Sequence, residues 1–354
     1  MSPSSPDSSI RDALEALLSD NLPADAVQAI EAGGSWDGLW RAIEQSGFAD
    51  ALSGETSGGA GLSLSEVLPL WMLAGRFAMP VPLAETMVAR SLLCASAEPV
   101  PDAPIALGWA RVNEKGVVLC HAVVGAGLAA NVLVDCEGTL RLLSVASARS
   151  VTSAFVLDRQ LSWEKSVWQT APALKHHADL RLAQALILSA QLAGALDAVF
   201  ERTLSWANTR TQFGRPIGKF QAIQHQLALL AEESFASRIA AQIGCLTQRV
   251  SSLDEGSSQT LLPAVFAIDP VRVAVAKART SEAALQGAQL AHAIHGAIGF
   301  TREFDLQLFT RRLHAWRQAA GSESYWHTVI GRALLGSNSL LSLDLLRAAT
   351  DGTC

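Results

Sequence analysis

Residues Arg210 to Ala228, RTQFGRPIGKFQAIQHQLA, combine side chains that can bind a phosphate and a flat ring. A guanidinium such as that of Arg210 can pair with phosphate in a hydrogen-bonded fork, and Phe213 can stack on a planar ring. Glycines in the same stretch let a backbone approach a ligand closely. A Gly-Pro connector between two helices, with Arg210 on its surface, explains the same residues. On chemistry alone both interpretations stay open.

Residues His292 to Arg312, HAIHGAIGFTREFDLQLFTRR, form a second informative segment. We expect a helix to end at Gly296, with Gly299 three residues further on and the small Ala297 between them. Such a turn can admit a cofactor or the backbone of a partner. The alternative is a plain glycine-terminated helix.

Familiar catalytic patterns are absent from the sequence, which has no GxSxG, P-loop, HExxH or complete GxGxxG. His225, His292 and His295 fall on predicted helices, where a histidine usually has a packing or surface role. The five cysteines contain no CxxC pair, so neither a disulfide framework nor a metal site is indicated. We therefore expect a reducing, cytoplasmic location.

Three regions with different residue patterns must position the two segments. Residues 1–95 predict an N-terminal helical domain, in which Ser63 and Glu66 form a capping box at the start of a helix. Residues 96–168 predict a small β domain, because short Val- and Leu-rich runs alternate with turns. Residues 169–354 predict an antiparallel helical bundle, so the fold class is mainly α.

The bundle is expected to contain a few long helices joined by short links. Asp269 is a typical N-cap, Pro270 a typical first helical residue, and Gly296 a typical end. The predicted helices cover 179–208, 220–251, 269–295, 306–318 and 324–346. The Arg210 segment then becomes a turn between two long helices.

The composition limits the partners. The 354 residues are 49% hydrophobic and carry a net charge of −6, which excludes a disordered chain and gives no electrostatic case for nucleic acid or an anionic membrane. The N-terminus does not resemble a signal peptide. Residues 116–134 are long enough to span a bilayer, but His121, Asn131 and several glycines favour two buried strands joined by a turn. We therefore expect no membrane partner.

Together the two segments resemble the most recognisable motifs of the acyl-CoA dehydrogenase family. An upstream stretch, GGAGLSLSEVLPLWMLAGRFAMPVPLAET at 58–86, resembles the N-terminal helical domain of bacterial members. The order of helical domain, β domain and bundle is also similar, and the resemblance covers most of the chain. It implies an acyl-CoA dehydrogenase-like fold.

The resemblance also implies chemistry. Members of the family bind FAD and remove the α and β hydrogens of an acyl-CoA thioester, with a carboxylate as base and flavin N5 as hydride acceptor. Their flavins lie across a dimer interface, where one β domain holds the isoalloxazine ring and the neighbouring bundle holds the ADP half. By motif position, Arg210 would contact the pyrophosphate, and Phe213 and Gln221 would line the same site. Gly296 and Gly299 would allow close approach from the second loop.

The chain departs from the family at the base. Members carry a Glu just before a Gly-Thr or Gly-Ser pair, and alignment puts Ala320 at that place. Glu323 is near in sequence. Some members place the Glu early in the first bundle helix, where this chain has Gln184 and, more than a turn before it, Asp179. Asp179 and Glu323 are weak candidate bases, and a first-turn acid favoured by the helix dipole is the simpler interpretation of Asp179.

The cofactor cradle differs as well. Between 96 and 168 there is no Thr-Glu-Pro followed by Gly-Ser-Asp and no Trp-x-Thr-Asn run. Ala293 replaces a Gln that binds the cofactor in many members. We therefore expect a chain that does not hold its own isoalloxazine ring.

These losses resemble one kind of subunit in the α2β2 heterotetramers of bacterial steroid and bile-acid side-chain breakdown. In them one chain keeps the base and flavin cradle, and the other completes the FAD site. We expect such a base-less subunit, with FAD, a homologous base-carrying partner and a bulky acyl-CoA substrate. Two alternatives remain: a self-sufficient homomeric enzyme with a relocated carboxylate, and a non-catalytic helical scaffold.

Overall fold

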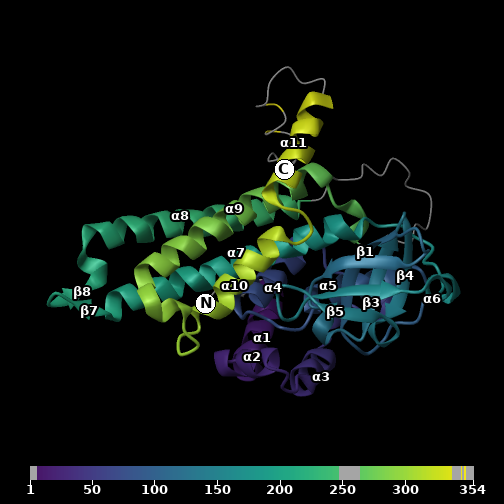
Figure 1. The fold of residues 1–354 in the computed structure, drawn as a ribbon, viewed down its shortest axis with the longest axis horizontal. Helices are drawn as coiled ribbons and strands as arrows, with labels where there is room; N and C mark the ends of the chain where they lie inside the picture. Colours follow the sequence, from purple (N-terminus) through teal and green to yellow (C-terminus); the bar gives the residue numbers. More distant parts are fainter. Residues whose placement is uncertain (1–5, 247–263, 337–343, 345–346, 348–354) are drawn as a thin grey trace.

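The computed structural model describes residues 6–246, 264–336, 344 and 347. Figure 1 shows a long helical bundle extending to one side, a β domain on the other, and the N-terminal helices below their junction. The order of helices, sheet and bundle follows the sequence expectation. The domain limits at 95/96 and 168/169 stay predictions.

In the described part of the chain, five α-helices precede the sheet. They are α1 (Pro6–Asn21), α2 (Ala24–Glu31), α3 (Asp37–Ser46), α4 (Leu64–Arg76) and α5 (Leu83–Ala95). The predicted capping box is confirmed, because the Ser63 hydroxyl accepts from the Glu66 backbone N–H and the Glu66 carboxylate accepts from the Ser63 N–H. Helix α4 ends at Arg76, and Ala78, two residues later, adopts a left-handed φ of 48°.

The middle region forms a six-stranded sheet in the order β4-β3-β1-β2-β6-β5. Its strands are β1 (Ile105–Val112), β2 (Val118–Val123), β3 (Asn131–Cys136), β4 (Thr139–Ser144), β5 (Arg149–Thr152) and β6 (Arg159–Trp163), followed by the short helix α6 (Lys165–Thr170). The uncharged stretch 116–134 forms β2 and the start of β3, as predicted. Strands β1 and β3 run parallel, and every other neighbouring pair in this sheet is antiparallel.

The bundle contains α7 (Leu180–Thr209), α8 (Gln221–Gly244), α9 (Pro270–His295), α10 (Leu306–Gln318) and α11 (Glu323–Gly336). The predicted caps at Asp269 and Gly296 are confirmed. Helix α8 ends at Gly244. The predicted helix ends at Ser251 and Leu346 lie outside the described residues. Helix α7 is long and apolar enough to cross a membrane, but 89% of its most apolar window is buried inside this fold.

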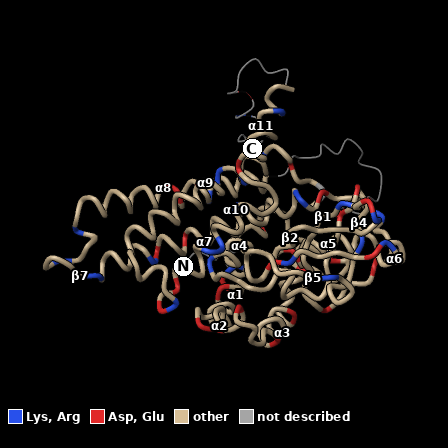
Figure 2. Tube along the Cα trace, in the orientation of Figure 1, with Lys and Arg blue, Asp and Glu red and all other residues tan. Residues whose placement is uncertain are grey.

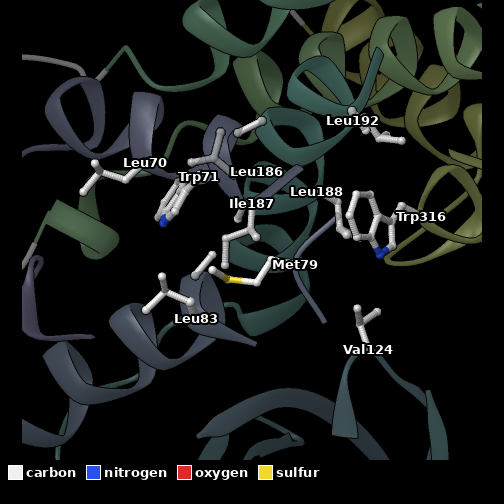
Figure 3. Close-up of a cluster of buried hydrophobic side chains, with 14 of the residues drawn as sticks. Leu70, Trp71, Met79, Leu83, Val124, Leu186, Ile187, Leu188, Leu192 and Trp316 are labelled. Carbon is white, nitrogen blue, oxygen red and sulfur yellow. The ribbon is translucent and has the colours of Figure 1, made fainter. Parts of the chain in front are cut away.

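The three regions share one core. Figure 3 shows Trp71 from α4, Leu186 and Leu188 from α7, and Trp316 from α10 in one cluster of buried side chains, with Val124 of the β region facing Trp316. Helices α4 and α7 cross so closely that a Cβ built on Gly194 would lie 1.8 Å from the Met72 carbonyl oxygen. This shared core holds the bundle in place against the sheet. It thereby also positions the turns that follow α7 and α9.

Candidate functional site

The turn between α7 and α8 is a short β-hairpin that presents Phe213. Strands β7 (Thr211–Gln212) and β8 (Arg215–Pro216) pair antiparallel. The two residues between them, Phe213 and Gly214, have φ values of 52° and 77°, the pattern of a type I′ turn. A left-handed backbone costs a non-glycine residue roughly 1–2 kcal/mol. The Phe213 side chain is 91% exposed, so the hairpin displays a large aromatic ring to the outside.

The second segment turns sharply at the end of α9. Gly296 has a φ of 67°, and the short helix η7 (Gly296–Phe300) follows. A Cβ at Gly299 would lie 3.1 Å from the His295 Cβ and 3.2 Å from His292 Nδ1. Gly299 is therefore buried because the turn packs tightly against α9, and its close approach is to this chain's own residues.

A cavity of about 650 Å³ lies between the two segments. Its lining residues are Trp206, Arg210, Gln212, Phe213, Ile217, Phe220 and Ile223 from the first, and 293–298 from the second. The structure thus brings Arg210, Phe213 and Gly296 together, although they are far apart in sequence. Gln221 is the exposed first residue of α8, directly after the lining Phe220, and neither it nor Gly299 lines the cavity.

Aromatic rings and one cation define the chemistry of this cavity. Trp206 stacks on His295 with ring centroids 5.5 Å apart, and the Arg210 guanidinium lies 5.8 Å from the Trp206 ring. His295 Nδ1 lies 2.8 Å from the Ala291 carbonyl oxygen, and burial lowers the pKa of His295, so the imidazole is neutral. Arg210 is the one charged side chain in this lining.

The surrounding hairpin adds further positive charge. Its sequence carries Arg210, Arg215 and Lys219, and Figure 2 shows Lys and Arg positions in blue near β7. The cavity therefore favours an anionic ligand that carries a flat ring. Trp206 was not predicted, although it lies only four residues before Arg210, the C-cap of α7, whose backbone N–H donates to the Trp206 carbonyl.

The position aligned with the family base carries no carboxylate. Ala320 is 3% exposed with a φ of 57°, and its carbonyl accepts from Arg181 Nε at 3.3 Å. The same turn is held by Lys277, whose Nζ donates to the Arg317 carbonyl at 3.0 Å and lies 3.4 Å from that of Gly321. Burial lowers the pKa of Lys277 to about 7.

The two weak candidate bases have structural roles. Asp179 is the exposed N-cap of α7 and accepts from the Leu182 N–H at 2.9 Å. The Glu323 carboxylate pairs with Arg317, with Oε1 2.7 Å from Nη2. Gln184 is fully buried and donates to Glu85 at 2.8 Å. Glu85, which no sequence pattern singles out, is a buried carboxylate whose pKa is raised by desolvation.

The cleft between the β domain and the bundle is nearly filled. It measures about 20 Å³, against roughly 300–1,000 Å³ for ordinary ligand pockets. Its lining includes the rings of Trp316 and Phe155, the buried Arg312, and the carboxylates of Asp158 and Glu85. This space leaves little room for a three-ring flavin.

The bundle matches a known protein family, and most of the chain is similar to named proteins. Residues 182–335 match the family model described as acyl-CoA dehydrogenase, C-terminal domain. The chain is 29% identical to “Acyl-CoA dehydrogenase IpdE2” of Mycobacterium tuberculosis, over 87% of this chain and 91% of that protein. It is 26% identical to “Acyl-CoA dehydrogenase FadE34” of the same species, over 89% of this chain and 45% of that longer protein.

Solved structures share the fold at lower identity. The ChsE4-ChsE5 complex from Mycobacterium tuberculosis gives a TM-score of 0.77 at 17% identity, over 96% of this chain and 99% of that chain. The Tcur3481-Tcur3483 steroid ACAD gives 0.75 at 22% identity, over 93% and 97%. The predicted fold is therefore confirmed: N-terminal helices, a small middle sheet and a C-terminal bundle.

Proposed function

We propose that the chain is the base-less subunit of a heteromeric, FAD-dependent acyl-CoA dehydrogenase, because residues 182–335 match the C-terminal domain of that family and most of the chain is similar to a protein named acyl-CoA dehydrogenase. The observation that carries this proposal is a contrast between two sites. The cavity beside the α7–α8 hairpin measures about 650 Å³ and is lined by rings and a guanidinium, whereas the cleft against the β domain measures about 20 Å³. We infer that this chain contributes one half of a cofactor site.

The open cavity fits the nucleotide half of FAD. Arg210 would hold the pyrophosphate, because a guanidinium binds phosphate oxygens in a fork. Trp206 and Phe213 would contact the flat or sugar portions, and the small residues 296 and 297 leave room at the second loop. When bound, FAD supplies the hydride acceptor for α,β-desaturation.

The residues of this chain would then bind and orient the cofactor, and the proton acceptor would come from another chain. Ala320 has no group that can take a proton, and Asp179 and Glu323 are engaged as a helix cap and an ion pair. The exposed ring of Phe213 faces outward from the hairpin, where a partner subunit would cover it. We therefore place the base and the isoalloxazine cradle on a homologous partner chain.

The partner and the substrate class are proposed from the neighbours. One similar structure is a complex of two differently named chains, and another is named a steroid ACAD. We propose by analogy an α2β2 heterotetramer in the cytoplasm that acts on a bulky acyl-CoA with a steroid or bile-acid type side chain. No residue that lines the described cavities specifies the chain length or the ring system of that acyl group.

The test is flavin retention in a complex co-expressed with the partner dehydrogenase. We expect Arg210→Gln to weaken flavin binding at least tenfold, because one charge-assisted fork to phosphate contributes roughly 1.5–3 kcal/mol. Arg41→Gln, which removes an exposed arginine on α3, is the matched control and should leave flavin content unchanged. Equal flavin content in both variants would count against the proposed nucleotide contact.

A further inference from the structure

A second cavity lies where the N-terminal helices, the β domain and the bundle meet. It measures about 640 Å³ and shares no residue with the cavity beside the hairpin. Its walls come from α2, from Val156 and from the segment between the end of α9 and α10. They are Gln28, Glu31, Ala32, Val156, His292, Phe300, Arg302, Gln307, Thr310, Arg311 and His314.

One wall of this second cavity is a fixed aromatic surface. The Phe300 side chain is 69% exposed and stacks on His292, with ring centroids 4.0 Å apart and planes 13° from parallel. His292 is held in turn by a hydrogen bond between its Nε2 and the Thr310 hydroxyl at 3.0 Å. Because the pair is already ordered, a flat ligand that stacks on Phe300 would lose little additional side-chain entropy.

The charged residues around the second cavity are mainly cationic. Glu31 is the one carboxylate in the lining, and both of its oxygens are already bound, one by Arg311 and one by Arg312 at 2.6 Å. Arg302 has no acidic partner within the described part of the chain. Asp305 nearby is paired with Arg202 at 2.7 Å, and the exposed Glu303 does not line the cavity. Two arginines sharing one carboxylate, with a third unpaired, leave an excess of positive charge.

We propose that the second cavity binds a purine nucleotide, with the base on Phe300 and a phosphate between Arg302 and Arg311. The lining favours this class over an acyl chain, because eight of its eleven residues carry polar or charged side-chain groups. The amides of Gln28 and Gln307 supply hydrogen-bonding groups for a base edge or a ribose. The nucleotide handle of CoA and a free nucleoside diphosphate share this chemistry. The assignment rests on these residues alone and does not depend on the proposed flavin site.

The test uses the co-expressed complex, with ADP and CoA as separate probes in equilibrium dialysis. We expect saturable binding of at least one probe, weakened tenfold or more by Arg302→Gln and several-fold by Phe300→Leu. Arg41→Gln should leave binding unchanged. Tighter binding of CoA than of ADP would identify the CoA handle as the source, and the reverse order would identify a free nucleotide. Failure of both probes to bind would overturn the proposal.

Arg210→Gln separates the two sites. In that variant we expect flavin to be lost while nucleotide binding in the second cavity persists, and photolabelling with 8-azido-ADP should mark residues around Phe300. Labelling confined to the α7–α8 hairpin, or binding that survives both Arg302→Gln and Phe300→Leu, would overturn the second site. Absence of flavin from every variant would bear on the proposed function alone.

Discussion

Asp158 lies in surroundings that disfavour its charge. Burial raises the pKa of its carboxyl to about 6, although the Gly125 N–H donates to it and Arg159 and Arg312 favour its ionised form. The folded protein therefore binds more protons than the unfolded chain between pH 4 and pH 6. By linkage, this contribution to stability is present below pH 4 and is lost as the pH rises through 6.

Asp158→Asn should remove this pH dependence. Asparagine keeps an oxygen that can accept from Gly125, so the variant should be more stable than the wild type above pH 6, on the order of 2–3 kcal/mol. The difference should vanish toward pH 4. Urea unfolding at pH 4, 6 and 8 measures it. A difference that is the same at all three pH values would show that Asp158 does not titrate in this way.

Single residues also show how far sequence reasoning reaches. Arg210 and Phe213 stand out because the local pattern of Arg, Phe, Gly and Pro is unusual. Glu85 and Arg312 do not, because their significance comes from burial between elements that are distant in sequence. In the small cleft the Arg312 guanidinium lies 5.5 Å from the Phe155 ring, and no local sequence pattern predicts that residues so far apart in sequence meet.

At the level of elements, Asp179 serves as a cap in this structure. Its carboxylate accepts from the Leu182 N–H at the start of α7. Asp179→Ala should destabilise the protein by about 1 kcal/mol, while Asp179→Asn should be nearly neutral, since asparagine caps equally well. Both variants should keep full turnover in the co-expressed complex. Loss of turnover in Asp179→Asn with flavin still bound would instead identify Asp179 as the base.

The crossing of α4 and α7 depends on two glycines. A Cβ on Gly75 would lie 1.9 Å from the Gln191 carbonyl oxygen, and one on Gly194 would lie 1.8 Å from that of Met72. Gly194→Ala must push the helices apart and should cost about 3 kcal/mol or more. Gly331→Ala in α11 meets no atom within 4 Å and should be neutral or stabilising by up to about 1 kcal/mol. Thermal unfolding of the two variants checks the contrast, and similar costs would contradict it.

Elements differ in how well the sequence predicts them. Strong caps such as Ser63 and Asp269 fix helix starts, so those were predicted correctly. Residues 84–93 also predict a helix, which the structure confirms as α5, but the sequence does not indicate that this helix is buried on every side over residues 83–93. The parallel pairing of β1 with β3 is not visible in the sequence either, because alternation within a strand does not specify its neighbour.

The whole molecule places two different cavities at the ends of one segment. Residues 293–298 line the first cavity, and Phe300 with His292 lines the second. The small cleft against the sheet supports the proposal that this chain is not a self-sufficient enzyme. On that proposal the chain contributes half of a cofactor site, and we expect its chemistry to require a second polypeptide.

Counting flavins per polypeptide tests this account most directly. The chain should be purified alone and in complex with its co-expressed partner dehydrogenase, with flavin absorbance and protein measured on each. We predict that the chain alone is colourless and does not oxidise an acyl-CoA, and that the complex holds one flavin for every two chains. A yellow chain that oxidises an acyl-CoA without any partner would contradict the account.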